Sequence, residues 1–436
     1  MTMAASMTAL EQPPVLLGGS KSIADGEEEL FQWPVVTEED EQAVLEVLRS
    51  GTMSRIEITR QFESEFAAYI GTAFSLAYPN GTMALLAAMY AVGVRRGDEI
   101  IVPSITFWSS AMPAFSLGAT VVFADIDLDT LCLDPADIER WISPRTKAIM
   151  PVHYFGHPCD MDAITAVARK HDLKIIEDCS HSHGSRYQGR MTGTLGDVSV
   201  FSLMTGKGLA IGEGGVLCTD DRGIIERAAG FGNYARHEEL LAEPELKANA
   251  GVPWGGVKGR MNQMCAALGR VQLKHFPERL VTIERAMTRF WDCLAGVPGI
   301  RPHRTRPQTN STMGAWYHPV GLYDPEQLNG LPSHEFMAAV NAEGVKLRGT
   351  CNFPLHLHPV FNELDVYGDG RPTRNAFSDR DVRQPKGTLP RAEIAPQRTI
   401  RIPWFKHDRA ASIERYAGVY RKIAMHSAAL AEKVSG

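Results

Sequence analysis

The 436-residue sequence lacks features that mark membrane-spanning, secreted and nucleic-acid-binding proteins. No apolar run reaches the roughly 20 residues that cross a bilayer, and the N-terminus lacks the basic, then apolar pattern of a signal peptide. Positive charge is not in excess, because the formal net charge is −6. We therefore expect neither a membrane nor a nucleic acid as partner.

Cysteine is scarce and irregularly spaced. The seven cysteines are odd in number and never form a C-x-x-C pair. This pattern argues against a disulfide framework or a zinc cage and is typical of reduced thiols in the cytoplasm. We expect a cytoplasmic protein without a metal site.

Two nucleotide-binding loops are also missing around Lys207, the one lysine in the glycine-rich stretch "VFSLMTGKGLAIGEGG". A P-loop would need glycine at Phe201 and Ser or Thr at Gly208. A dinucleotide fingerprint would need a third glycine at Ile211. Lys207 is left as an amine that follows a strand-like run and lies between two glycines.

The sequence does contain apolar, strand-like runs that alternate with amphipathic helical patterns. We expect strands at 72–78, 99–105, 120–126, 147–155, 173–179, 197–203 and 214–219. Helices are expected after the N-cap Thr37 and at about 82–94, 109–117 and 160–171. This alternation predicts an α/β fold with a mostly parallel sheet between two layers of helices.

The pattern changes along the chain. The first dozen or so residues predict a disordered tail, and residues 362–396 predict a long loop. After about residue 285 the pattern becomes a mixture of helices and strands. We expect an N-terminal tail or arm (1–30), a large domain (31–285) and a smaller α+β domain (286–436).

Chemistry is expected at the strand ends, because open parallel sheets bind ligands at their carboxyl edge. Asn80, Gly81 and Thr82 open a helix after a strand, where free N–H groups and the helix dipole suit a phosphate. A plain strand–turn–helix joint would have the same sequence.

A second group follows the strand "LKIIEDC". Asp178 ends this strand, where a carboxylate needs a cation or hydrogen-bond donors. His181 and His183 follow at alternate positions. Two other interpretations stay open, an N-cap aspartate with structural histidines and a two-histidine metal site without an evident third ligand.

Lys207 and an aromatic pair are the remaining candidate groups at the strand ends. A lysine against apolar walls has a lowered pKa and can form a Schiff base, although a glycine-rich turn with an exposed lysine is the plainer alternative. Phe107 and Trp108 follow a strand, and either ring could belong to the core or stack on a flat heterocycle.

Together the phosphate seat, stacking ring, carboxylate and lysine are what pyridoxal 5'-phosphate requires. Their order and spacing resemble the DegT/StrS family of sugar aminotransferases, which have the fold-type I aminotransferase architecture. The resemblance runs from about residue 31 to the C-terminus. It implies the following roles: phosphate contacts at Gly81, Thr82 and Ser202, a ring over the cofactor at Phe107, a partner for the pyridine nitrogen at Asp178, and the Schiff-base lysine at Lys207.

The sequence departs from the family pattern in informative places. His181 stands where the family often has glutamine beside the cofactor, as in a branch that acts on cyclitol ketones and 3-amino-5-hydroxybenzoate precursors. "GGVKGRMNQM" is similar to a segment that reaches the neighbouring subunit's cofactor phosphate, with Lys258 in place of asparagine; a solvated loop lysine is the alternative. "FPLHLHPVF" is similar to a segment near the substrate entrance and makes His356 a candidate substrate contact.

The resemblance implies a homodimeric aminotransferase with shared active sites. It would move an amino group from an amino acid, glutamine or glutamate, to a keto sugar or cyclitol ketone in amino-sugar or antibiotic biosynthesis. One alternative is a dehydratase or aromatising lyase of the same family. A non-catalytic regulator is the other, and the presence of both Lys207 and Asp178 argues against it.

Overall fold

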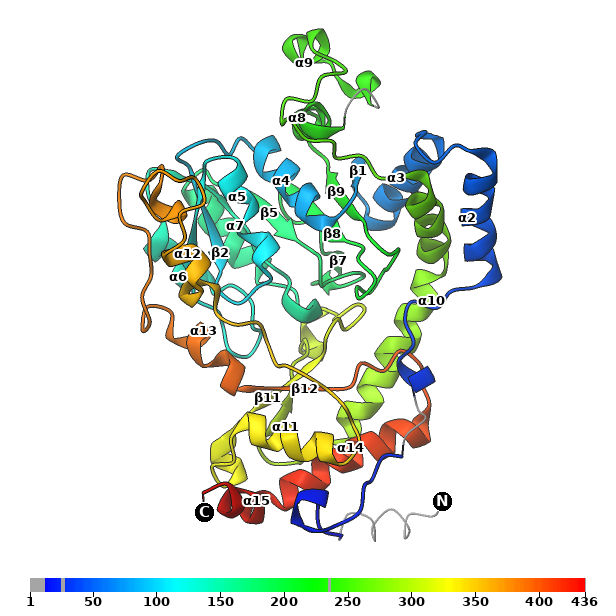
Figure 1. Cartoon of the computed structure of the whole chain (residues 1–436), viewed down its shortest axis with the longest axis vertical. Coiled ribbons are helices and arrows are strands. Elements are labelled where there is room, and N and C mark those ends of the chain that lie inside the picture. The colour runs from blue at the N-terminus through cyan, green and yellow to red at the C-terminus, as the bar shows by residue number, and fades with distance from the viewer. Residues whose placement is uncertain (1–11, 25–27, 234–236, 436) are drawn as a thin grey trace.

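A mixed seven-stranded sheet with helices packed around it forms the upper part of the molecule in Figure 1. The computed structural model describes residues 12–24, 28–233 and 237–435. In sheet order the strands are β1 (Phe74–Tyr78), β9 (Gly215–Thr219), β8 (Val198–Ser202), β5 (Lys174–Asp178), β4 (Thr146–Ile149), β2 (Glu99–Pro103) and β3 (Thr120–Ala124).

The sheet is mostly parallel, as the sequence predicts. The pairs β2–β3, β2–β4, β4–β5 and β5–β8 are parallel, whereas β9 runs antiparallel to both β8 and β1. All residues of β2, β3 and β9 are buried. Uninterrupted burial is what a sheet covered on both faces requires, and it explains why these strands are continuous apolar runs instead of alternating ones.

Helices cover the sheet and connect its strands. The helices of this part are α2 (Glu38–Ser50), α3 (Glu57–Ile70), α4 (Gly81–Ala91), α5 (Pro113–Ser116), α6 (Pro135–Trp141), α7 (Met161–Lys170), α8 (Arg222–Gly232) and α9 (Pro244–Ala248). The predicted N-cap at Thr37 is confirmed: its side chain accepts a bond from the Asp40 N–H while the Asp40 carboxylate accepts from the Thr37 N–H. This capping box satisfies two N–H groups that the first turn leaves free.

The helix expected at 109–117 is interrupted. A 3₁₀ turn covers Trp108–Ser110, and α5 begins only at Pro113. Proline has no N–H group to donate within a helix but is well suited to a first position, so it starts a new helix here. The break leaves Ser109 and Ser110 next to the carboxyl end of β2.

A second, three-stranded antiparallel sheet lies lower in Figure 1, in the order β10 (Ile300–Pro302), β11 (Val320–Tyr323) and β12 (Thr399–Arg401). It packs with α11 (Ser333–Ala342), α14 (Ala410–Met425) and α15 (Ser427–Ser435). The 31-residue helix α10 (Gln263–Cys293) contributes its first half to one apolar cluster beside the large sheet and its second half to the cluster around the small one. The boundary that we propose near residue 285 lies within this helix.

The segment predicted as a long loop, 362–396, follows α12 (Pro359–Asn362) and contains a 3₁₀ turn at Thr373–Asn375, the short helix α13 (Pro390–Ile394) and the start of a 3₁₀ turn at Ala395–Gln397. It runs along β3, the edge strand of the large sheet. Gln384 bonds both the N–H and the carbonyl of Phe123, and Arg374 donates to the Val121 carbonyl. Side chains thus satisfy main-chain groups that an edge strand leaves unpaired.

The ends of the chain complete the fold. Residues 1–11, most of the predicted tail, lie outside the described residues, whereas Val15 and Ile23 bond Glu343 beside α11. In the part of the chain that the structure describes, no helix is both long and apolar enough to cross a membrane.

Candidate active site

A cavity of about 570 Å³ opens at the carboxyl edge of the large sheet. Four predicted groups at or after the carboxyl ends of β1, β2, β5 and β8 contribute to its wall: Gly81 and Thr82, Phe107, Asp178 with His181, and Ser202 with Lys207. Residues 317–318, 349–352 and 401 from the second half of the chain close the opposite side. The tertiary structure therefore brings together residues that are up to 320 positions apart.

The N-terminus of α4 forms one end of the cavity. Asn80 caps the helix by accepting from the Met83 N–H, and the first-turn N–H groups of Gly81 and Thr82 have no intrahelical acceptor. A Cβ at Gly81 would lie 2.8 Å from the Ser202 Cβ, so only glycine lets the helix approach the end of β8 this closely. The Thr82 hydroxyl lies 2.8 Å from that of Ser109. Free N–H groups, hydroxyls and the positive end of the helix dipole together suit a phosphate.

Asp178 is buried at the end of β5, where donors hold its carboxylate in place. The Ser110 hydroxyl donates to Oδ2 (2.7 Å), and the Ser180 N–H donates to Oδ1 (3.0 Å). Ser110 is in turn bonded to Thr106 across 2.8 Å. A buried, oriented carboxylate that faces a cavity is suited to pair with a cation there.

Lys207 is 6% exposed and has no acidic partner within 4.0 Å among the described residues. Its Nζ lies 4.3 Å from the centre of the Tyr317 ring, and Trp33 donates an indole N–H to its carbonyl (2.8 Å). Burial lowers the Lys207 pKa to about 8, opposed by the charge of Asp178. A substantial fraction of this amine is therefore neutral near physiological pH, as a nucleophile or proton acceptor must be.

The loop that carries Lys207 is constrained on both sides. Thr205 donates to the Gly212 carbonyl (2.8 Å), so the chain turns back on itself between them. A Cβ at Gly208 would lie 2.4 Å from the Ala315 Cβ, which explains the glycine directly after the lysine. The glycine-rich sequence serves a close approach between two segments, with the lysine side chain facing inward.

The two histidines after Asp178 differ in their surroundings. His181 lines the cavity and stacks on Tyr317, with ring centres 4.4 Å apart. His183 is buried beside Phe201, and neither of its ring nitrogens has a hydrogen-bond partner. Burial and then the charge of Lys207 lower both pKa values, that of His183 to about 3, so both rings are neutral.

These residues fit pyridoxal phosphate. The α4 N-terminus with the Thr82 and Ser202 hydroxyls offers donors to the phosphate, Asp178 offers a carboxylate to a protonated ring nitrogen, and Lys207 offers a partly neutral amine to the aldehyde. The geometry of the cavity is therefore compatible with the predicted roles of these residues.

Three other predicted residues lie at the margin of this cavity or outside it. Phe107 is 45% exposed at the cavity wall, with its ring centre 5.1 Å from that of Trp108. Lys258 is exposed in the loop after α9 and is not part of the cavity wall. His356 is fully buried outside the wall, with Nδ1 2.6 Å from the Ser104 hydroxyl and Nε2 3.1 Å from Glu393. Both ring nitrogens of His356 thus have protein partners.

Sequence reasoning missed several residues of the site. Ser110, Tyr317, His318 and Arg401 line the cavity, and Trp33 holds the Lys207 loop from outside. The aromatic run "AWYH" at 315–318 was the available signal for Tyr317 and His318. Nothing in the local sequence distinguishes Arg401 or Ser110 from other polar residues.

One cluster of potential metal ligands occurs among the described residues, formed by His153, Glu177 and Cys179. His153 Nε2 lies 2.9 Å from Glu177, and Nδ1 accepts from the Cys159 N–H (3.0 Å). Glu177 also accepts main-chain N–H groups from the 193–196 turn. The cluster includes neither His181 nor His183, and the ring nitrogens of His153 and the carboxylate of Glu177 already have protein partners.

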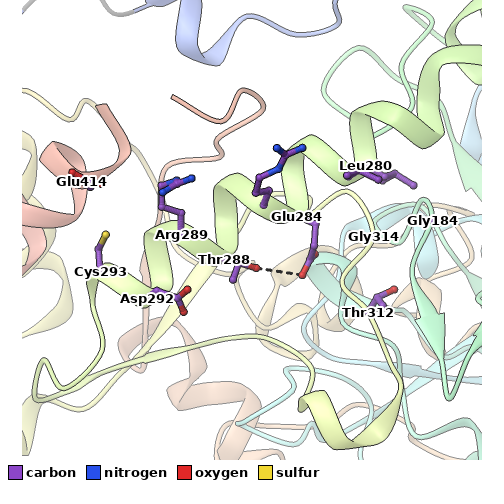
Figure 2. Close-up of a pocket in the computed structure, with 12 residues that line it drawn as sticks. Gly184, Leu280, Glu284, Thr288, Arg289, Asp292, Cys293, Thr312, Gly314 and Glu414 are labelled. Carbon is purple, nitrogen blue, oxygen red and sulfur yellow. Dashed lines mark hydrogen bonds between the residues drawn. The ribbon is translucent and has the colours of Figure 1, made fainter. Parts of the chain in front are cut away.

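A larger groove of about 850 Å³ follows the outer face of α10 (Figure 2). Glu284 points from the helix toward the strand-like segment with Thr312 and Gly314, and its carboxylate accepts a bond from Thr288. Arg285 and Arg289 of this groove pair with Asp408. Asp408 neutralises the two arginines, and the groove lacks a buried lysine and carboxylate that converge as in the first cavity.

Comparisons with known proteins identify close similarity over most of the chain. Residues 34–412 match the profile of the DegT/DnrJ/EryC1/StrS aminotransferase family. The chain is 35% identical to the spore coat polysaccharide biosynthesis protein SpsC of Bacillus subtilis over 77% of this chain and 86% of that protein. It is 33% identical to L-glutamine:2-deoxy-scyllo-inosose aminotransferase of Micromonospora echinospora over 85% and 88%.

Among solved structures, that of 3-amino-5-hydroxybenzoic acid synthase superposes with a TM-score of 0.75. It is 26% identical and covers 91% of this chain and 98% of its own. The fold-type I architecture predicted from the sequence is therefore confirmed.

Proposed function

The chain belongs to the DegT/DnrJ/EryC1/StrS aminotransferase family, and from this premise we propose that it transfers the amino group of glutamine or glutamate to a keto sugar or cyclitol ketone. As a member of this family it is a pyridoxal-phosphate-dependent aminotransferase. One observation supports the proposal most directly. Lys207 is buried without an ion-pair partner among the described residues, in a cavity that also contains Asp178 and the α4 N-terminus.

When bound, pyridoxal phosphate supplies an aldehyde that takes up an amino group and a ring that accepts electron density. Gly81, Thr82 and Ser202 orient it by its phosphate. Asp178, fixed by Ser110, keeps the ring nitrogen protonated. Lys207 Nζ, partly neutral because of its burial, would accept the proton from the donor's α-carbon and deliver it to the carbon of the cofactor's former aldehyde. His181 and Tyr317 exclude water from one wall by stacking.

The acceptor class rests on similarity. A relative of 33% identity is named for glutamine and 2-deoxy-scyllo-inosose, a cyclitol ketone. His181 also stands in the cavity at the position that suggested this branch. The lyase alternative is less favoured, because the names of three relatives describe amino transfer. Biosynthesis of an amino sugar or an antibiotic, in the cytoplasm, is the role we propose.

A homodimer with shared sites is part of the proposal. Three aromatic side chains near the cavity are exposed: Phe107 (45%), Trp108 (46%) and Phe353 (58%). Phe107 itself lines the cavity, as does Asn352, the residue before Phe353. Such apolar exposure beside a functional cavity suits cover by a second subunit. Exposed Lys258 would then reach the partner's cofactor phosphate as a point charge.

The test combines a covalent label with a substrate screen. Borohydride reduction of the yellow, cofactor-loaded protein should leave the label on Lys207 in a peptide map. Keto sugars, nucleotide-linked keto sugars and inososes are then offered with glutamine, glutamate and alanine as donors. A label on any other lysine would contradict the Lys207 assignment, and the absence of amino transfer to every ketone would contradict the proposed acceptor class.

A further inference from the structure

Two indole N–H groups anchor the main chain beside the cavity. Trp33 donates to the Lys207 carbonyl (2.8 Å), and Trp404 donates to the Ala315 carbonyl (2.8 Å). Both tryptophans are half-buried, and neither is part of the cavity wall. An indole that is partly removed from water usually finds an acceptor for its N–H group. Here the acceptors are main-chain carbonyls of the two segments that carry Lys207 and Tyr317.

The two anchored segments touch each other. A Cβ at Gly208 would lie 2.4 Å from the Ala315 Cβ, so the main chains meet directly after the lysine. On the cavity side of the same contact, Lys207 Nζ lies 4.3 Å from the centre of the Tyr317 ring. The main-chain positions at 207 and 315 therefore determine how the amine faces this ring.

Lys406 joins the two indoles. Its Nζ lies 4.2 Å from the centre of the Trp404 ring and 5.6 Å from that of the Trp33 ring, and it donates to the Phe31 carbonyl (3.2 Å). The two ring centres are 6.2 Å apart. A cation close to aromatic faces is attracted to them. We call Trp33, Trp404 and Lys406 the indole clamp.

The segment that carries Trp33 is itself fixed on α10. The Val35 carbonyl accepts bonds from Gln272 (3.0 Å) and Arg279 (3.1 Å), both of which belong to this helix. The Arg279 guanidinium also lies 5.8 Å from the centre of the Trp33 ring. Trp33 is thus held by α10 and by Lys406, and its N–H group is a donor in a fixed position.

Both main-chain polar groups of Lys207 are bonded. Its N–H donates to the Met204 carbonyl (2.8 Å), within its own turn, whereas its carbonyl accepts from Trp33, 174 positions away. Without the second bond the lysine would be fixed only by its own loop. Because a misplacement of about 1 Å can cost about 100-fold in rate, the reach of the amine depends on this main chain.

We infer that Trp33 is a positioning residue of the reaction. Through its bond to the Lys207 carbonyl, and braced by Trp404 and Lys406, it places the Lys207 amine where it accepts the proton of the donor's α-carbon. The inference rests on the proposed function, because it requires Lys207 to be the acceptor of that proton. Trp33 acts through Lys207, since it is not part of the cavity wall.

The experiment removes one indole N–H group at a time. Trp33→Phe keeps a ring and loses the donor, and Trp404→Phe does the same at the second indole. Trp141→Phe is the matched control, because this indole donates to Asp137 (2.9 Å) within α6 and outside the cavity wall. Hydrogen–deuterium exchange of residues 203–212 in cofactor-free protein reports how firmly the loop is held. Stopped-flow spectra of each holoenzyme with glutamate, or with α-deuterated glutamate, report cofactor amination.

In cofactor-free Trp33→Phe, exchange within residues 203–212 should be about five- to tenfold faster than in wild type, because one bond that holds the loop is lost. The maximal rate of amination should fall about 10- to 30-fold, while the donor KM changes less than about twofold. The deuterium isotope effect on this rate should exceed that of wild type, because proton transfer becomes slower than the other steps. Trp404→Phe should show smaller changes in the same direction, and Trp141→Phe should match wild type.

Three results would overturn the inference. Unchanged exchange and amination in Trp33→Phe would leave Trp33 a packing role, and an equal loss in Trp141→Phe would attribute the effect to general destabilisation. A defect confined to the donor KM would show that Trp33 affects donor binding instead of the position of Lys207. If Trp33→Phe does not fold, the same measurements on Trp404→Phe decide whether the indole clamp positions the lysine. If borohydride does not label Lys207, the proposed function fails, while exchange in cofactor-free protein still decides whether Trp33 holds the loop.

Discussion

Lys207 shows how one residue acquires its chemistry from its surroundings. Its burial without an acidic partner disfavours the charged form, and this lowers its pKa to about 8. An unfolded lysine has a pKa near 10.4. Between these two values the unfolded chain binds more protons than the folded one, so folding becomes more favourable as pH rises through this window.

The first prediction follows from this increase in stability with pH. In cofactor-free protein, the stability of wild type relative to Lys207→Met should increase from about pH 8 to about pH 10.5 and be constant below pH 8. The total change should be about 3 kcal/mol, since each pKa unit is worth about 1.4 kcal/mol. Thermal unfolding midpoints of both proteins across this range provide the measurement.

Lys147→Met is the control for this measurement, because Lys147 is exposed on β4. Its midpoint should follow that of wild type at every pH. A constant difference between wild type and Lys207→Met across the window would show that burial does not perturb the lysine.

Asp178 carries the second prediction. Asp178→Asn should retain the cofactor but lose about 100- to 1000-fold in kcat, because a neutral amide no longer stabilises a protonated ring nitrogen at close range. Ser110→Ala, which removes the 2.7 Å bond to Oδ2, should cost less, about tenfold. The absorption spectrum of each variant measures its cofactor content, and steady-state kinetics measure its kcat. A near-normal kcat in Asp178→Asn would make the carboxylate a structural cap.

Among the elements, β3 and the 362–396 segment show how an edge strand can be closed without another strand. The amide of Gln384 replaces a neighbouring backbone, donating to the Phe123 carbonyl (2.6 Å) and accepting from its N–H (3.0 Å). Arg374, fully buried, donates to Gln384 and to the Val121 carbonyl. Such a segment protects the sheet from pairing with other chains.

The third prediction tests this closure. Gln384→Leu should lower stability by about 3 kcal/mol, because it leaves two buried main-chain groups and part of Arg374 without partners. Arg383→Gln, at an exposed neighbour paired only with Asp381, should change stability by less than about 0.5 kcal/mol. Urea unfolding followed by fluorescence gives both values. Equal midpoints for Gln384→Leu and wild type would mean that water replaces these bonds without cost.

At the scale of the whole molecule, α10 connects the two sheets. Its first half packs beside the large sheet and its second half beside the small one, so their relative position is set by one continuous element. That position brings Tyr317, His318 and Arg401 opposite Lys207. The active-site cavity is thus a product of the whole chain.

The fourth prediction concerns assembly. If each site takes Lys207 from one subunit and Lys258 from the other, a mixed dimer of Lys207→Ala and Lys258→Ala contains one site with both defects and one intact site. Heterodimers purified through two different tags should recover about half of the wild-type activity per dimer, provided that Lys258→Ala alone is severely impaired.

Asp178→Asn mixed with Lys207→Ala is the matched control for this test, because both residues lie in the same chain's cavity. That heterodimer has one defect in each site and should stay inactive. If the Lys207/Lys258 heterodimer is also inactive, Lys258 does not act across an interface.

The sequence by itself determined the α/β class, the mostly parallel sheet and the residues that follow its strands. Strand and helix periodicity are local properties, and parallel strands place their carboxyl ends at one edge whatever the details of packing. This is why Gly81, Asp178, Ser202 and Lys207 could be grouped before any coordinates were known. The Thr37 cap was predictable for the same local reason.

Only the tertiary structure decided which residues of the second half of the chain line the cavity, and how readily the Lys207 amine loses its proton. Arg401 and Tyr317 reach the site because α10 and the small sheet pack in one particular way, and no local pattern encodes such long-range packing. The lowered pKa of Lys207 depends equally on burial by distant residues, among them Tyr317. The position of His356, buried outside the cavity wall, was equally beyond sequence reasoning, because a motif shows which residue is present but not which way it faces.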